Sequence, residues 1–270
     1  MNAPNEVAVN VIAIGKKKAS LPAEKLFVLG ILAGMFIAFA AVGANTASSV
    51  IENAGVSKLI GALLFPARLA MVLVAGSELF TGNSLIIIGV LEKEVTFAAM
   101  CKNWLFVYLG NFVGALLVAW LVNAGHQLSL FSNALAGTTI NVATAKAALS
   151  FGDAFIRGVL CNFLVCIAVW MSFAAKDIAG KIIGLFFPVM LFVLCGFEHS
   201  VANMYYVPAG LFALANPAYA SAATANVSLL TWGNFLINNL IPVTLGNVVG
   251  GVGLVGIPYW LVYLKKSKSA

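Results

Sequence analysis

Polar residues that could carry chemistry interrupt a long apolar stretch in the second half of this sequence. Glu198, His199 and Asn203 stand there together, with Gly196 before them and Pro208 after them. Hydrocarbon solvates none of these side chains. A charge at a bilayer centre costs at least ~2.5–3.5 kcal/mol, so such groups face a protein interior or an aqueous path. The glycine and the proline indicate an interrupted helix whose freed backbone groups line a cavity.

His199 is the candidate for function within this stretch. An imidazole exchanges protons near physiological pH, and we expect this one to lie on the path of a small permeant anion. The alternative is a buried histidine that its neighbours satisfy within a helix bundle.

The composition indicates whether the chain folds in water or in a membrane. Of its 270 residues, 62% are hydrophobic and 9% are charged, with a mean hydropathy of +1.02, whereas a soluble domain carries ~25% charged residues. The chain is therefore predicted to be an all-α membrane protein in contact with lipid. Its net charge of +6 does not indicate a nucleic-acid partner, because most charges lie at segment ends, where they orient the protein in the membrane.

The four cysteines have no spacing typical of a metal site. Cys101, Cys161, Cys166 and Cys195 lie within or at the ends of apolar segments, so we interpret them as small buried hydrophobes without disulfides. No metal and no cofactor is predicted. The first apolar run is long enough to span and lacks a convincing cleavage site, so we expect it to stay as the first membrane helix.

Three parts are expected along the chain: a cytoplasmic N-terminal segment over 1–25, one transmembrane domain over 26–264 and a cytoplasmic tail over 265–270. The N-terminal segment fits either a helix on the membrane surface, with its lysines near anionic lipid, or a frayed basic tail. The domain contains six apolar blocks, each near the ~20 residues needed to span. They run approximately over 26–50, 59–89, 103–124, 153–175, 181–214 and 234–264.

The basic residues predict the orientation of these spans. An even number of spans places both termini on one side of the membrane. Eleven of the 15 basic residues fall on that side, so both termini are predicted to be cytoplasmic by the positive-inside rule. The expected location is the cell inner membrane, crossed several times.

Two motifs recur in the same order in the two halves. The pattern G-x-E-x-x-x-x-N begins at Gly76 and, 120 residues later, at Gly196; the tripeptide LGN ends at Asn111 and, 136 residues later, at Asn247. Three spans per half is an odd number, so the second half enters the membrane from the opposite face. This inverted 3+3 repeat, with broken second and fifth helices, predicts a pore or transport site between the breaks. Half-helix ends there offer positive partial charge to an anion.

Matched acids and amides stand at the two breaks. Glu78 and Asn83 belong to the first break, and Glu198 and Asn203 to the second. We favour a structural role, in which the carboxylates accept hydrogen bonds from freed backbone N–H groups and neighbouring amides. Direct contact with substrate is the alternative, although an exposed carboxylate repels an anion. The LGN asparagines are interpreted as packing polars, and the LGN glycines as sites of close helix approach.

At these residues the chain resembles the formate/nitrite transporter family of bacterial and archaeal pentameric channels. The matching stretches include AGSELFTGN at 75–83, GFEHSVANMYYVPAG at 196–210 and NLIPVTLGNVVGG at 239–251. The resemblance covers every span except the first. It implies an aquaporin-like six-helix bundle as the protomer, a homopentamer around an axis, and a separate pore in each protomer.

The resemblance also implies roles for individual residues. The family's central histidine falls on His199, and Thr81, in the loop that breaks the second helix, is expected to reach it. Lys146 and Asn162 match a polar pair near the outer side of the histidine. Arg68 departs from the pattern, because a small or apolar residue is expected there; it would face a vestibule or a protomer contact.

Two apolar constrictions are implied, one on each side of the histidine. Leu79 and Phe192 belong to the cytoplasmic one, with Phe80 in the same loop, and Phe65 and Leu69 belong to the outer one. Such slits offer no ligands to an ion. The histidine then either gives its proton to the anion, so that the neutral acid crosses, or donates only a hydrogen bond.

The implied function is a pH-sensitive channel for small monovalent weak-acid anions, with formate first and hydrosulfide or nitrite next. An aquaporin-like facilitator of neutral solutes is the alternative, although the tripeptide Asn216-Pro217-Ala218 occurs once and outside the breaks. An enzyme that uses Glu198 and His199 as acid and base is disfavoured, because adjacent residues on a helix point in divergent directions.

Overall fold

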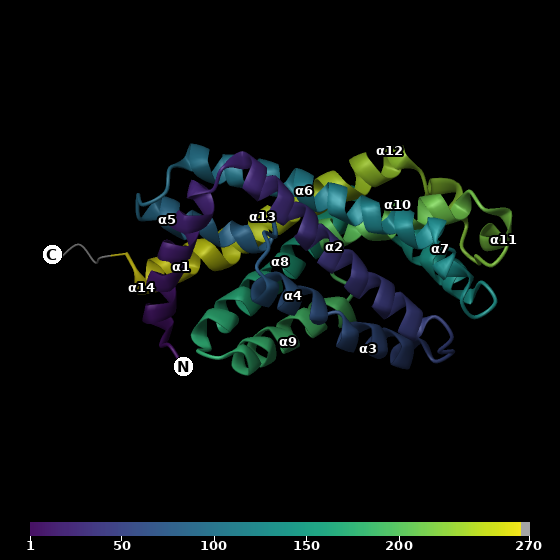
Figure 1. Cartoon of the computed structure of the whole chain (residues 1–270), viewed down its shortest axis with the longest axis horizontal. Coiled ribbons are helices and arrows are strands. Elements are labelled where there is room, and N and C mark those ends of the chain that lie inside the picture. The colour runs from purple at the N-terminus through teal and green to yellow at the C-terminus, as the bar shows by residue number, and fades with distance from the viewer. Residues whose placement is uncertain (266–270) are drawn as a thin grey trace.

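A computed structural model describes residues 1–265, and every regular element within them is a helix (Figure 1). The predicted tail, apart from its first residue, lies outside the described residues. Four of the predicted spans are long helical stretches: α2 (Ala23–Ser48), α6 (Phe97–Ala124), α8 (Phe151–Ala174), and the run of α12 (Trp232–Asn234), α13 (Ile241–Val248) and α14 (Ile257–Tyr263), which wider π-helical turns join. All four are long and apolar enough to cross a bilayer.

The second and the fifth span are both broken, as predicted. The second consists of α3 (Ala54–Leu64) and α4 (Ala67–Ala75), then an extended loop, then α5 (Ile86–Leu91). The fifth consists of α9 (Ile178–Leu194), a loop, and α10 (Ser200–Leu214). Each break begins at a glycine in the left-handed region, Gly76 with φ 81° and Gly196 with φ 71°, a conformation that glycine adopts without a steric penalty.

Two further helices, of 17 and 14 residues, are longer than any other helix outside the predicted spans. The N-terminal segment forms α1 (Pro4–Ser20), and the connection between the third and fourth spans contains α7 (Ala134–Ala147). Val7 and Val11 of α1 are buried, and α1 packs against α5, α6 and α8. The N-terminal segment is therefore neither a frayed tail nor a helix held by lipid alone, because its apolar residues are covered by the protein.

Glycines bring the long helices into direct backbone contact. A Cβ atom at Gly110 of α6 would overlap the carbonyl oxygen of Phe27 in α2, and one at Gly246 of α13 would overlap that of Phe155 in α8. Only a residue without a side chain fits at such crossings. The predicted role of the LGN glycines is confirmed, and these crossings hold the spans that flank each break.

The two halves of the bundle are inverted relative to each other. In Figure 1, α1, α5 and α14 lie at one end of the molecule, and α3, α7 and α11 (Pro217–Ala220) lie at the other. We call these the terminal side and the far side. Elements at equivalent places in the repeat, such as α1 and α7, therefore lie at opposite ends. The predicted fold class, an all-helical membrane bundle with an inverted repeat and two broken helices, is confirmed.

Candidate transport site

A buried ion pair fastens the second break on the far side. Lys146, near the end of α7, donates from Nζ to Glu198 Oε1 at 2.9 Å and Oε2 at 3.0 Å. Asn203 Nδ2 donates to Glu198 Oε2 at 2.7 Å and to Asn239 Oδ1 at 2.8 Å. Asn239 Nδ2 closes the ring on the Lys146 carbonyl at 2.9 Å. The charge of the carboxylate is thereby balanced by Lys146, and both of its oxygens are hydrogen-bonded within the chain.

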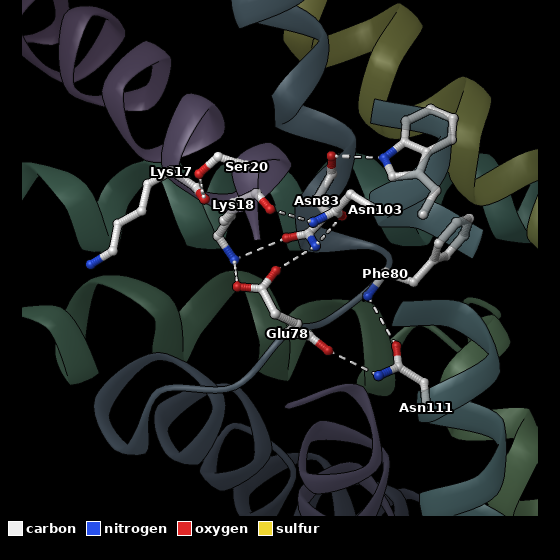
Figure 2. Close-up of polar contacts among 9 residues, drawn as sticks. Lys17, Lys18, Ser20, Glu78, Phe80, Asn83, Asn103 and Asn111 are labelled. Carbon is white, nitrogen blue, oxygen red and sulfur yellow. Dashed lines mark hydrogen bonds and ion pairs between the residues drawn. The ribbon is translucent and has the colours of Figure 1, made fainter. Parts of the chain in front are cut away.

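The first break repeats this network on the terminal side, with Lys18 of α1 in the place of Lys146 (Figure 2). Lys18 Nζ lies 2.9 Å from Glu78 Oε1 and 3.0 Å from Asn83 Oδ1. Asn83 Nδ2 donates to Glu78 Oε2 at 2.7 Å and to Asn103 Oδ1 at 2.8 Å. Asn103 Nδ2 returns to the Lys18 carbonyl at 3.2 Å. The repeat therefore includes α1 and α7, and each half has four segments rather than the predicted three.

Two asparagines, rather than the glutamates, hydrogen-bond to the backbone groups that have no helical partner at the two breaks. Asn111 Oδ1 accepts from Phe80 N at 3.0 Å, and its Nδ2 donates to the carbonyls of Gly30 and Glu78 at 2.8 and 2.9 Å. Asn247 makes the equivalent bonds in the other half. Reading the LGN asparagines as packing polars was therefore wrong, because a buried loop requires a partner for each of its backbone groups.

His199 joins the two breaks at the centre of the bundle. Its Nε2 lies 2.9 Å from Thr81 Oγ1, which is the contact that the resemblance implies. Its Nδ1 accepts the backbone N–H of Ala202 at 3.1 Å and so caps α10. Because a backbone N–H can only donate, Nδ1 carries no proton in this arrangement. The neutral ring then has its proton on Nε2, where it is a hydrogen-bond donor.

Two cavities approach this centre from opposite ends. The far-side cavity has a volume of about 440 Å³, and its lining includes Lys58, Lys146, Arg157, Glu198 and His199. Three cations against one paired acid give it a net positive charge. The terminal-side cavity is smaller, about 30 Å³, and mainly apolar, with Lys18 in its lining. We call the wall between the two cavities the septum.

The predicted constriction residues are grouped differently from the expected pairs. Phe65 and Phe192 meet edge to face, with ring centroids 6.0 Å apart, and both line the far-side cavity. Leu69 and Leu79 both line the terminal-side cavity. Phe80 is in neither lining and packs on Tyr108 of α6 at 4.8 Å. Sequence spacing could not give these pairs, because they depend on how α4 and α9 are rotated toward each other.

Asn162 lies at the first break rather than beside Lys146. Its Nδ2 donates to the Asn247 carbonyl at 2.6 Å, to Ser84 Oγ at 3.1 Å and to the Thr81 carbonyl at 3.3 Å. These bonds use its amide inside the protein. Asn162 therefore holds the backbone of Thr81, whose hydroxyl contacts His199.

Arg68 lies inside the septum, and neither expected environment fits it. Its side chain is fully buried within the single chain, so it faces neither a vestibule nor another protomer. Its Cζ lies 4.6 Å from the ring centroid of Phe65 and 4.5 Å from that of Phe192. The guanidinium therefore contacts two rings that line the far-side cavity.

Lys18 is the main functional candidate that the sequence analysis missed. A signal existed: Lys18 precedes Lys146 by 128 positions, as Gly30 precedes Gly158.

The tripeptide Asn216-Pro217-Ala218 begins the short helix α11 (Pro217–Ala220), where Asn216 Oδ1 accepts a hydrogen bond from Ala218 N. It belongs to neither break.

A duplicated, inverted helix bundle with cavities on both sides of a buried polar centre defines a membrane channel or transporter. The sequence family described as formate/nitrite transporter matches residues 5–261. This chain belongs to that family.

Named relatives cover nearly the whole chain. The uncharacterized transporter YrhG of Bacillus subtilis (strain 168) is 41% identical, over 98% of this chain and 95% of its own length. The formate channel FocA of Escherichia coli (strain K12) is 38% identical, over 94% of this chain and 91% of its own. A solved structure described as a pentameric formate channel with formate bound is similar, with a TM-score of 0.80 at 36% identity, over 90% of this chain and 98% of that one.

Proposed function

We propose that this protein is a pH-sensitive channel for small monovalent anions of weak acids, with formate first and nitrite or hydrosulfide next. It assembles as a homopentamer in the cell inner membrane, with both termini in the cytoplasm. The observation that carries this proposal is a hydrogen-bond donor, His199, between a cation-lined cavity and an apolar one. The names of two similar proteins support the substrate and the assembly, since one is a formate channel and the other a pentamer with formate bound.

The far-side cavity supports an anion as the substrate. Lys58, Lys146 and Arg157 face it, and its acid, Glu198, is already paired. Positive charge in a cleft with low-dielectric walls raises the local concentration of anions. A channel for neutral solutes gains nothing from this arrangement. In the cell, this cavity faces outward, because the basic residues of α1 and of the short connections gather on the terminal side.

The bonds of His199 favour hydrogen-bond donation over proton transfer. A neutral ring that gave its Nε2 proton to the anion would become an imidazolate. A doubly protonated ring first requires that Ala202 N–H lose its acceptor, Nδ1. Donation from Nε2 to the anion, in exchange for Thr81, needs neither step. The pH sensitivity then arises from the weak acid itself, whose neutral fraction increases as the pH falls.

Flux measurements with purified protein in liposomes test the proposal. Formate, nitrite and hydrosulfide are compared with glycerol and water, and we expect saturable passage of at least one anion above the rate of empty liposomes. Osmotic swelling by the neutral solutes without anion flux would instead support the aquaporin-like alternative. Assembly is measured separately, as the mass of the detergent-solubilised particle.

The substitution His199→Asn tests the central residue without removing the helix cap. An asparagine Oδ1 can accept from Ala202 N–H as the histidine does, but it leaves the Nε2 position empty. A hydrogen bond to a charged group contributes about 1.5–3 kcal/mol, so formate flux should fall at least ~tenfold while the pentamer remains intact. Flux equal to that of the unmodified protein would place His199 outside the path.

A further inference from the structure

Arg68 is a buried cation of the septum whose charge no described residue balances. Its side chain is 0% exposed, and Nε, Nη1 and Nη2 have no hydrogen-bond partner within residues 1–265. The acids nearest the pore are already used, since Glu78 pairs with Lys18 and Glu198 with Lys146. A buried charge is normally paired and hydrogen-bonded. Arg68 therefore requires a partner that the described chain does not supply.

The aromatic neighbours stabilise this charge without satisfying its donors. Phe65 and Phe192 each place a ring within 4.6 Å of the guanidinium carbon, which is the geometry of a cation–π contact. A ring face accepts no in-plane hydrogen bond, whereas a guanidinium carries five N–H donors in one plane. The site therefore supplies aromatic contacts and leaves a planar set of donors without an acceptor.

Arg68 lines neither cavity itself, but its neighbours line both. Phe65 and Phe192 line the far-side cavity, and the Phe192 ring lies 6.1 Å from the ring of His199. Leu69, the next residue, lines the terminal-side cavity. An ion that leaves one cavity for the other must pass through this wall.

The repeat shows that the helix scaffold does not need an arginine here. The position 120 residues after Arg68, which corresponds to it in the second half, is Pro188 in α9. Proline has neither charge nor a polar side chain, yet α9 leads into its break as α4 does. The arginine therefore adds something to the first half that the fold alone does not use.

We propose that Arg68 binds the permeant anion inside the septum by paired hydrogen bonds, and that it makes the channel favour planar anions with two oxygen atoms. This inference rests on the proposed function and specifies its substrate class. A guanidinium fork matches two oxygen atoms of one group, as in formate or nitrite. Hydrosulfide has a single sulfur atom and cannot make both bonds.

The test compares two substitutions at Arg68 in liposome flux assays with formate and with hydrosulfide. Arg68→Met removes the charge and the donors but keeps a long side chain, and Arg68→Lys keeps the charge but loses the fork. We expect Arg68→Met to raise the half-saturating formate concentration at least ~tenfold and that of hydrosulfide less than about twofold. Arg68→Lys should lie between. Arg157→Met, in the far-side cavity, is the matched control and should affect both anions equally.

The outcomes separate this inference from the proposed function. Equal changes for formate and hydrosulfide in Arg68→Met, or no change for either, would overturn the role of Arg68 while the channel function stands. An unmodified protein that passes none of formate, nitrite and hydrosulfide would overturn the channel function itself. If the variants do not assemble, an experimental structure of the unmodified protein in formate decides: an anion within hydrogen-bond distance of Nη1 or Nη2 supports the inference, and water alone there refutes it.

Discussion

The ion pair between Lys18 and Glu78 predicts that α1 is a structural part of the channel, and a double-mutant cycle can measure this. Removing one partner of a fully buried pair costs 3–5 kcal/mol because the other charge is left unpaired. Here the lysine side chain is 23% exposed and the carboxylate 8%, so water screens part of the charge. We expect Lys18→Met to lower the stability of the protein by about 2–3 kcal/mol.

The assay is thermal unfolding of the purified protein in detergent. By the scaling of globular domains of similar length, this loss lowers the midpoint by roughly 4–10 °C. Glu78→Gln should also be destabilising, because Lys18 then loses its counter-charge. The double variant should recover part of the loss, because it removes both charges together.

Lys17 provides the control for this cycle. It is the preceding residue of α1 and is exposed, and its ammonium has no hydrogen bond within the described chain (Figure 2). Lys17→Met should therefore change the stability by no more than about 0.5 kcal/mol. A Lys18→Met midpoint equal to that of Lys17→Met, or a double variant that loses the sum of the single losses, would refute the anchoring of α1.

Two further predictions concern the break and the surface. Asn247→Leu removes three buried hydrogen bonds, at 2.8, 2.9 and 3.0 Å, and should lower the free energy of unfolding by about 3–6 kcal/mol in the same assay. The control is Asn238→Leu, at an exposed position. Equal unfolding midpoints for the two variants would contradict the structural role of Asn247. At the surface, the hydrogen bond and charge of Lys16 lower the pKa of Glu94, and those of Glu94 raise the pKa of Lys16. Glu94→Gln should therefore be slightly less stable than the unmodified protein above about pH 5, and this difference should disappear on acidification. A difference in stability that grows in acid would contradict the prediction.

The breaks could be predicted from the sequence because they depend on local signals. A glycine, an acid and an asparagine at fixed spacing inside an apolar block that is too long for one span indicate a broken helix. This indication does not depend on where the helix packs in the fold. The second copy begins 120 residues later. Because each half contains three spans, an odd number, the second half is predicted to be inverted. The contact between Thr81 and His199 joins residues 118 positions apart, and it came from the resemblance alone.

The docking of α1 and the state of Arg68 could not be predicted, because both depend on distant packing. Lys18 is one of three consecutive lysines, and nothing local distinguishes the one that meets Glu78, 60 positions later. The buried state of Arg68 follows from the rotation of α4 against α9, which brings Phe192 over its guanidinium. Composition alone places an arginine outside such a core.

The site is asymmetric although the scaffold around it is duplicated. Both halves fasten their break with the same lysine, glutamate and asparagine network, yet the positions that face the centre differ. His199 corresponds to Leu79, and Val201 corresponds to Thr81. One half therefore supplies the imidazole and the other supplies the hydroxyl that it touches. The far-side cavity is lined by three cations and by His199, whereas the terminal-side cavity is mainly apolar and has one cation, Lys18, in its lining. Since buried scaffold charges are paired in both halves, this difference comes from the central side chains and from Arg68.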